Sequence, residues 1–157
     1  MDLQMTNVGQ KLSEADVVRV EEQLGALLPD SYRAFLLEFN GGRPDPHDFD
    51  VPGWRHQESL VNNFYGIVPG ESNDLVENAE LLEDRVPSDF IPIAKDPGGN
   101  RILLSAEGPT RGSVYFWDHE EEPDDPGEAL DDFPNIYRLA DDFDTFLEGL
   151  KPRDDEE

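Results

Sequence analysis

The sequence predicts one domain that combines helices with an antiparallel meander of strands, and three observations support this. The chain has 157 residues, the usual size of a single domain. Amphipathic helical segments stand near the N-terminus and at the C-terminus, and short β-rich runs separated by turn sequences lie between them. Nine Phe, four Tyr and two Trp are spread along the whole chain, so they supply bulky side chains for one core.

The two N-terminal helices carry start and stop signals. Ser13 is the predicted N-cap of the first, with Asp16 three positions on, and Gly25 is its predicted end because glycine takes positive φ without a penalty. The second is predicted over 30–39, where apolar side chains recur at i, i+3, i+4 and i+7. Asn40-Gly41-Gly42 ends it, since these residues tolerate the left-handed conformation.

The next segment is less regular. Residues 43–60 carry three prolines and many polar groups, so they predict an irregular loop in which Trp54 is the large apolar side chain. A strand is predicted over 63–68. A third helix is predicted over about 73–84, and Pro87 prevents much extension.

Three β-rich runs follow, at 90–94, 101–105 and 113–118. The stretches between them, 96–100 and 107–112, have turn chemistry, so the runs predict an antiparallel meander. In the third run Val114 and Phe116 alternate with Tyr115 and Trp117, which gives both faces large apolar groups. That strand is therefore predicted to be central or covered on both sides.

The chain then becomes strongly acidic. Residues 118–132, the acidic loop below, hold nine Asp or Glu and no Lys or Arg, and their prolines and glycine break any helix, so an exposed loop is predicted. Helical spacing over 143–150 predicts a final helix with Asp141 or Asp142 as N-cap. We expect one domain over 1–151 and an acidic tail over 152–157.

The charge balance narrows the classes of partner. The formal net charge is −25, from 37 acidic and 12 basic residues. This disfavours direct binding to nucleic acid or to anionic lipid, and it attracts a basic protein. The alternative is that the acidity serves solubility alone or reflects a salt-adapted proteome.

The expected compartment is the cytoplasm. No run approaches the ~20 apolar residues that span a bilayer, and the N-terminus lacks a signal-peptide pattern, so no membrane association is expected. The chain has no cysteine, which excludes disulfides and thiolate chemistry and fits a reducing compartment.

The titratable side chains show no pattern typical of catalysis or metal binding. An EF-hand register begun at Asp118 places Pro123 where the loop needs Gly. Nucleophile-elbow and P-loop motifs are absent, and the histidines lack zinc-ligand spacing: His47, His56 and His119. We therefore expect no catalytic residue, no metal and no cofactor; weak divalent-ion association and a hydrolytic carboxylate pair stay open as alternatives.

Four segments carry a family likeness in a fixed order. They are EQLG, LPDSYRAFL and NGG at 22–25, 28–36 and 40–42; IPIAKD and GN at 91–96 and 99–100; GSVYFWDHE at 112–120; and LADDFDTFL at 139–147 with Leu150. In these the chain resembles the SUKH family, which includes a fungal cell-wall regulator and many bacterial immunity proteins. The resemblance implies an α+β fold with a mainly antiparallel or mixed sheet packed against helices, action by protein binding, and no catalytic residues.

The predicted function joins this resemblance to the charge. We expect an immunity-type protein that blocks a cognate toxin domain, a basic one such as a nuclease, with acidic groups imitating phosphates. The alternative is a regulatory or scaffolding protein with an endogenous partner. A monomer or weak homodimer is expected. The candidate partner-binding residues are Trp54, Asp118, His119, Glu120, Glu121, Glu122, Asp124 and Asp125.

Overall fold

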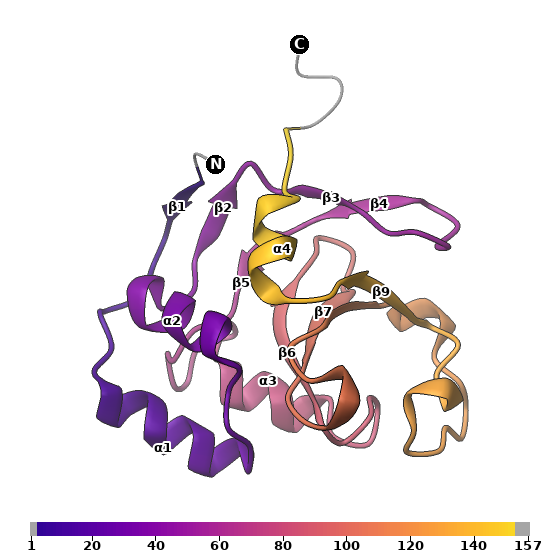
Figure 1. The fold of residues 1–157 in the computed structure, drawn as a ribbon, viewed down its shortest axis with the longest axis horizontal. Helices are drawn as coiled ribbons and strands as arrows, with labels where there is room; N and C mark the ends of the chain where they lie inside the picture. The colour runs from indigo at the N-terminus through magenta and orange to yellow at the C-terminus, as the bar shows by residue number, and fades with distance from the viewer. Residues whose placement is uncertain (1–2, 153–157) are drawn as a thin grey trace.

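Five antiparallel strands form the central sheet of the protein, in the order β5-β6-β7-β8-β9 (Figure 1). The computed structural model describes residues 3–152. The strands are β5 (Asn63–Phe64), β6 (Phe90–Lys95), β7 (Arg101–Ser105), β8 (Val114–Trp117) and β9 (Ile136–Ala140). The predicted meander of β6, β7 and β8 is confirmed, and β8 lies between two strands with all four residues buried, as predicted.

Four helices complete the α+β fold, which confirms the predicted class. They are α1 (Glu14–Leu24), α2 (Asp30–Phe39), α3 (Leu75–Leu81) and α4 (Phe143–Glu148). Ser13 caps α1 through a reciprocal pair of hydrogen bonds with Asp16, and Gly25 ends it at φ 73°. Asp142 rather than Asp141 caps α4, because its side chain accepts a hydrogen bond from the Thr145 N–H. No helix within residues 3–152 is long and apolar enough to cross a bilayer.

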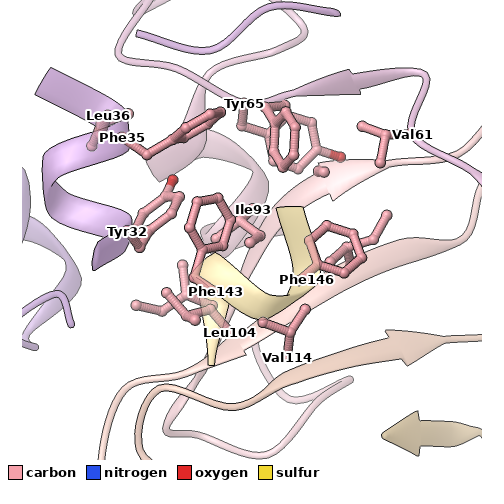
Figure 2. Packing of buried hydrophobic residues seen from close by; sticks show 14 of the residues in the cluster. Tyr32, Phe35, Leu36, Val61, Tyr65, Ile93, Leu104, Val114, Phe143 and Phe146 are labelled. Atoms are coloured by element: carbon pink, nitrogen blue, oxygen red, sulfur yellow. The ribbon is translucent and has the colours of Figure 1, made fainter. Parts of the chain in front are cut away.

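The two faces of the sheet are covered by different parts of the chain. Alternate residues of β7 and β8, including Ile102 and Phe116, join the main core with side chains from α1, α2 and α4. Figure 2 shows this core, in which the ring of Phe143 on α4 packs edge-on against Tyr32 and Phe35 of α2 at centroid distances of 5.2 and 5.0 Å. The helices therefore close one face.

The opposite face carries a smaller apolar cluster. Leu103, Tyr115 and Trp117 point to this side and meet Leu82 and Val86 from the segment after α3. Leu130 of the acidic loop also packs against the cluster. The acidic loop is thus part of the cover of the second face, which explains why β8 is apolar on both sides.

Residues 43–60 are more regular than predicted. They contain β2 (Arg43–Asp45), which pairs with an unpredicted β1 (Gln4–Thr6), and the two-stranded β3 (Asp48–Asp50) and β4 (Glu58–Leu60). The irregular-loop prediction was wrong because three-residue strands are too short to show a period. Pro44 is compatible with β2 because that strand has a partner on one side only.

Other boundaries also differ. The predicted strand over 63–68 is reduced to β5, and the helix over 73–84 is reduced to α3 behind the N-cap Asp74. The strand β9 was missed, although Tyr137 and Leu139 alternate toward the main core, because it is a half-buried strand between the acidic loop and α4. The predicted tail lies outside the described residues from 153 onward.

Candidate protein-binding surface

Asp118, at the end of β8, is a buried carboxylate with several donors. Its Oδ2 accepts a hydrogen bond from the Trp54 indole N–H at 2.9 Å, and its Oδ1 accepts from the Glu120 N–H at 2.9 Å. Its backbone exchanges two hydrogen bonds with Asn135, at 2.9 and 3.0 Å. Asp118 therefore fixes both ends of the acidic loop to the 51–57 segment.

Asp96 organises the turn between β6 and β7 in the same manner. Its Oδ1 accepts from the N–H groups of Gly98 and Asn100 at 2.9 and 2.8 Å. Its Oδ2 accepts from the Asn100 side-chain amide and from the Ser59 hydroxyl on β4. The predicted turn role of residues 96–100 is confirmed, and the carboxylate also joins this turn to β4.

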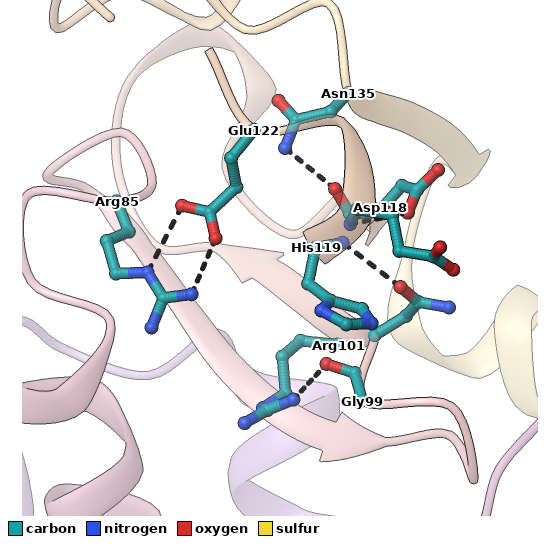
Figure 3. Close-up of polar contacts among 9 residues, drawn as sticks. Arg85, Gly99, Arg101, Asp118, His119, Glu122 and Asn135 are labelled. Carbon is teal, nitrogen blue, oxygen red and sulfur yellow. Dashed lines mark hydrogen bonds and ion pairs between the residues drawn. The ribbon is translucent and has the colours of Figure 1, made fainter. Parts of the chain in front are cut away.

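The two carboxylates belong to one structure, drawn in part in Figure 3. Asn100 Oδ1 accepts a hydrogen bond from the His119 N–H at 3.0 Å, which links the Asp96 turn to the start of the acidic loop. The His119 ring lies over Gly99, where an added Cβ would stand 3.2 Å from Nε2. We call these residues the buried carboxylate network: Trp54, Ser59, Asp96, Asn100, Asp118 and Asn135.

A second anchor holds the acidic loop from the other side. Glu122 accepts two hydrogen bonds from Arg85, at 3.1 and 2.5 Å, in a bidentate pair (Figure 3). The Arg85 guanidinium also lies 5.1 Å from the ring centroid of Trp117. Bidentate geometry makes such a pair more specific than a single contact. The acidic loop is therefore anchored to the rest of the fold, and it presents its exposed side chains from a fixed position.

The pKa values of Asp118 and Glu121 are shifted in opposite directions. Burial raises the pKa of Asp118, but hydrogen bonds from Trp54, the Glu121 side chain and the Glu120 N–H outweigh it, so the pKa lies below the ordinary aspartate value. The hydrogen bond with Asp118 raises the pKa of Glu121, and desolvation and the Asp118 charge add to this. Glu121 thus keeps its proton to a higher pH than an isolated glutamate.

The candidate residues occupy three different environments. Trp54 and Asp118 are buried, at 7% and 0% exposure, so the predicted exposed loop begins only after Asp118. The Trp54 indole packs against Phe116 at 4.6 Å between ring centroids, because an apolar side chain amid polar neighbours in sequence can still reach the core. His119 and Glu122 are half-buried, and the exposed members are Glu120, Glu121, Asp124 and Asp125.

A groove that sequence reasoning missed adjoins the acidic loop. It has a volume of about 850 Å³ and is lined by the end of α1, by α3 with the turn after it, and by the loop. Its lining includes acids from two sides, Glu80, Glu83 and Asp84 beside Asp124, Asp125 and Glu128. We call it the acidic groove. The acidic residues of 80–84 were the available signal, but only folding brings them to the loop.

A further groove, of about 780 Å³, lies near the start of the chain. It is lined by asparagines and glycines together with Arg43 and Lys95. Its most buried amide, that of Asn40, already donates to the Gln10 carbonyl and accepts from the Ile67 N–H. This groove is therefore explained by the packing of α2 against the neighbouring loops.

Groups of three or more His, Asp or Glu arranged to hold a metal ion do not occur within residues 3–152. The main chemical feature of this surface is negative charge, carried by a loop that hydrogen bonds hold in place. The acidic groove and the exposed acids of the loop are contiguous through Asp124 and Asp125. Such an arrangement is suited to a cationic partner.

Comparison with known proteins agrees with the fold. A sequence model of the SMI1 / KNR4 family (SUKH-1) matches residues 11–149, a range that holds all four helices and the whole central sheet. The chain is also 28% identical over 161 residues to the SPbeta prophage-derived uncharacterized protein YokK of Bacillus subtilis (strain 168), which covers 92% of this chain and 74% of that protein. The chain belongs to the SMI1 / KNR4 family (SUKH-1).

Proposed function

We propose that this protein is a non-catalytic immunity protein that binds and neutralises a cognate basic toxin domain, such as a nuclease. The observation that carries the proposal is the acidic loop, whose exposed carboxylates stand on a frame fixed at Asp118 and at Glu122. A pre-ordered binding surface loses less conformational entropy on association than a mobile one. The loop is therefore suited to tight binding as well as to attraction.

Family membership supports the proposal at a coarser level. The SUKH family includes immunity proteins, which act by binding toxin proteins. The Bacillus relative is described only as prophage-derived and uncharacterized, so its name adds no partner. That the partner is a toxin, that this toxin is a nuclease, and that the protein acts in the cytoplasm are parts of our proposal.

The mechanism we propose is occupation of a cationic cleft by carboxylates in place of phosphates. Glu120 and Asp124 accept no hydrogen bond and form no ion pair among the described residues, so both are available to a partner's Lys or Arg. Opposite charge on the partner would raise the association rate, most strongly at low salt. Glu122 is different because Arg85 already holds it.

The test uses capture followed by growth rescue. The tagged protein is incubated with lysate of its native organism at low and moderate salt, and bound proteins are identified by mass spectrometry. A basic toxin domain should be captured and released by salt, and co-expression should restore the growth of cells that make this toxin. Capture of a housekeeping protein, without rescue, would replace the proposal with the regulatory or scaffolding alternative.

Charge reversal then tests the acidic loop. A variant with Glu120→Lys, Glu121→Lys, Asp124→Lys and Asp125→Lys keeps Glu122, and we expect association with the captured toxin to slow about tenfold or more. The matched control reverses four acids outside the loop whose side chains are unpaired in the described chain, at Glu38, Glu71, Asp144 and Glu148. If the association rate falls equally in the two variants, the loop contributes only through the net charge of the protein.

A further inference from the structure

The carboxylates of the acidic groove are unpaired. The side chains of Glu80, Glu83 and Asp84 accept no hydrogen bond and form no ion pair among residues 3–152, and those of Asp125 and Glu128 on the facing side are equally free. The lining contains no Lys, Arg or His. Like charges gathered around a concave surface repel one another and focus a negative potential within it.

Apolar side chains also contribute to the lining of the same groove. Leu82, Val86 and Phe90, which form the cluster on the second face of the sheet, contribute to its lining. Two large exposed apolar side chains also stand next to it. Leu27 is 71% exposed and follows the lining residue Ala26, and Leu81, at the end of α3, is 57% exposed between the lining residues Glu80 and Leu82. The groove thus combines acidic walls with exposed apolar side chains at its margin.

Charge decides which occupant fits this groove. A second copy of the chain carries a net charge of −25, and the C-terminal residues 154–157 are all acidic, so both would place acid against acid. A segment with Lys or Arg beside apolar side chains would pair with the acidic walls and contact the apolar side chains at the margin. We infer that the acidic groove binds a basic amphipathic segment of the protein partner.

This inference rests on the proposed function only for the identification of the partner as a toxin. The groove itself can be tested without one. The probe is a fluorescein-labelled synthetic peptide of Lys and Leu, about 12–15 residues long and amphipathic as a helix. A second peptide has Ser in place of Leu and the same number of lysines. Binding to the full chain is followed by fluorescence anisotropy at about 0.15 M salt.

The Lys/Leu peptide should bind about tenfold or more tightly than the Lys/Ser peptide. It should shift the amide NMR signals of residues 23–26, 79–91 and 124–128. A variant with Glu80→Gln, Glu83→Gln and Asp84→Asn should weaken its binding about tenfold, and asparagine suits position 84 because its φ is 69°. Leu81→Ser should weaken the Lys/Leu peptide alone.

The matched control neutralises the same number of acids elsewhere, with Glu38→Gln, Asp144→Asn and Glu148→Gln, and should change affinity less than about twofold. Equal losses in the two variants, equal binding of the two peptides, or NMR shifts outside the groove would overturn the inference. The growth-rescue result stands apart from these outcomes. If the groove variant still rescues growth, the immunity function stands and the groove is not required for it.

Discussion

The protein uses carboxylates in two opposite ways at neighbouring places. In the buried carboxylate network, Asp96 and Asp118 each accept several hydrogen bonds and are 5% and 0% exposed. In the acidic groove, Glu80, Glu83 and Asp84 are exposed and accept none among the described residues. The same chemical group therefore holds loops together in one region and is left unpaired in the other.

The contrast shows that net charge alone says little about what each acid does. A buried carboxylate must be paired, because leaving it unpaired would cost several kcal/mol, about the size of a domain's whole stability margin. An exposed carboxylate has no such requirement, and a group of them lowers stability through repulsion. The network therefore supports the structure, whereas the acids of the groove are free for the recognition that we propose.

The largest expected effect is the loss of Asp118. Asp118→Ala leaves the buried Trp54 N–H without an acceptor, so we expect the free energy of unfolding to fall by about 3 kcal/mol. Chemical denaturation monitored by Trp fluorescence measures this. Asp124→Ala is the control and should change stability by less than about 0.5 kcal/mol. Comparable losses would contradict the division between network and surface.

The pKa of Asp118 predicts how this difference depends on pH. Because the folded pKa lies below the ordinary value, the carboxylate contributes stability above the unfolded pKa, and that contribution is lost as pH falls through the folded pKa. The gap in unfolding free energy between the native chain and Asp118→Asn should therefore narrow on acidification below about pH 4. A gap that is constant with pH would show that the charge is not involved.

The next effect compares the two tryptophans. Trp54→Phe removes the N–H that donates to Asp118, whereas the Trp117 N–H has no acceptor in the described chain, so Trp117→Phe removes no hydrogen bond. Both changes delete the same atoms. We expect Trp54→Phe to cost about 1–2 kcal/mol more in a urea titration. Equal costs would mean that the indole contributes only packing.

A smaller effect, an increase in stability, is expected from changes in the acidic groove. Neutralising Glu80, Glu83 and Asp84 as Gln, Gln and Asn removes mutual repulsion, so the Tm should rise at about 0.05 M NaCl. The gain should shrink at about 0.5 M because salt screens exposed charges. A thermal scan at both salt concentrations checks this. A lower Tm in the variant would show that these acids support the fold.

The smallest expected effect concerns Glu121, an exposed residue whose side chain interacts with Asp118 of the network. Its folded pKa is raised, so its ionised form costs stability at neutral pH, and this cost disappears as the pH falls below the unfolded pKa. Glu121→Gln should therefore have the higher Tm at pH 7, and the two proteins should converge near pH 3. If the two Tm values instead move apart as the pH falls, the folded pKa of Glu121 is not raised.

Much of the fold was predictable because its signals are local. The caps at Ser13 and Gly25, the apolar face of α2 and the turn residues at 96–100 act over a few positions, and each was found where expected. The short strands β1 to β4 were not, since three residues are too few for a pattern. Their pairing depends on strands that meet only after folding.

The candidate site was predictable only in part. The exposure of Glu120, Asp124 and Asp125 followed from an acidic run without apolar residues. The burial of Trp54 and Asp118 did not, because it depends on packing against Phe116 and on a hydrogen bond between residues that are 64 positions apart. The part of α3 in the groove was missed for the same reason.

The sequence by itself determined the family, the α+β class, the ends of the first two helices and an excess of negative charge. The tertiary structure alone decided which acids are structural and which are free. The physical reason is that a carboxylate's role depends on the donors around it and on its distance from water. Those donors include Trp54 and Arg85, which only the folded chain brings together with the acidic loop.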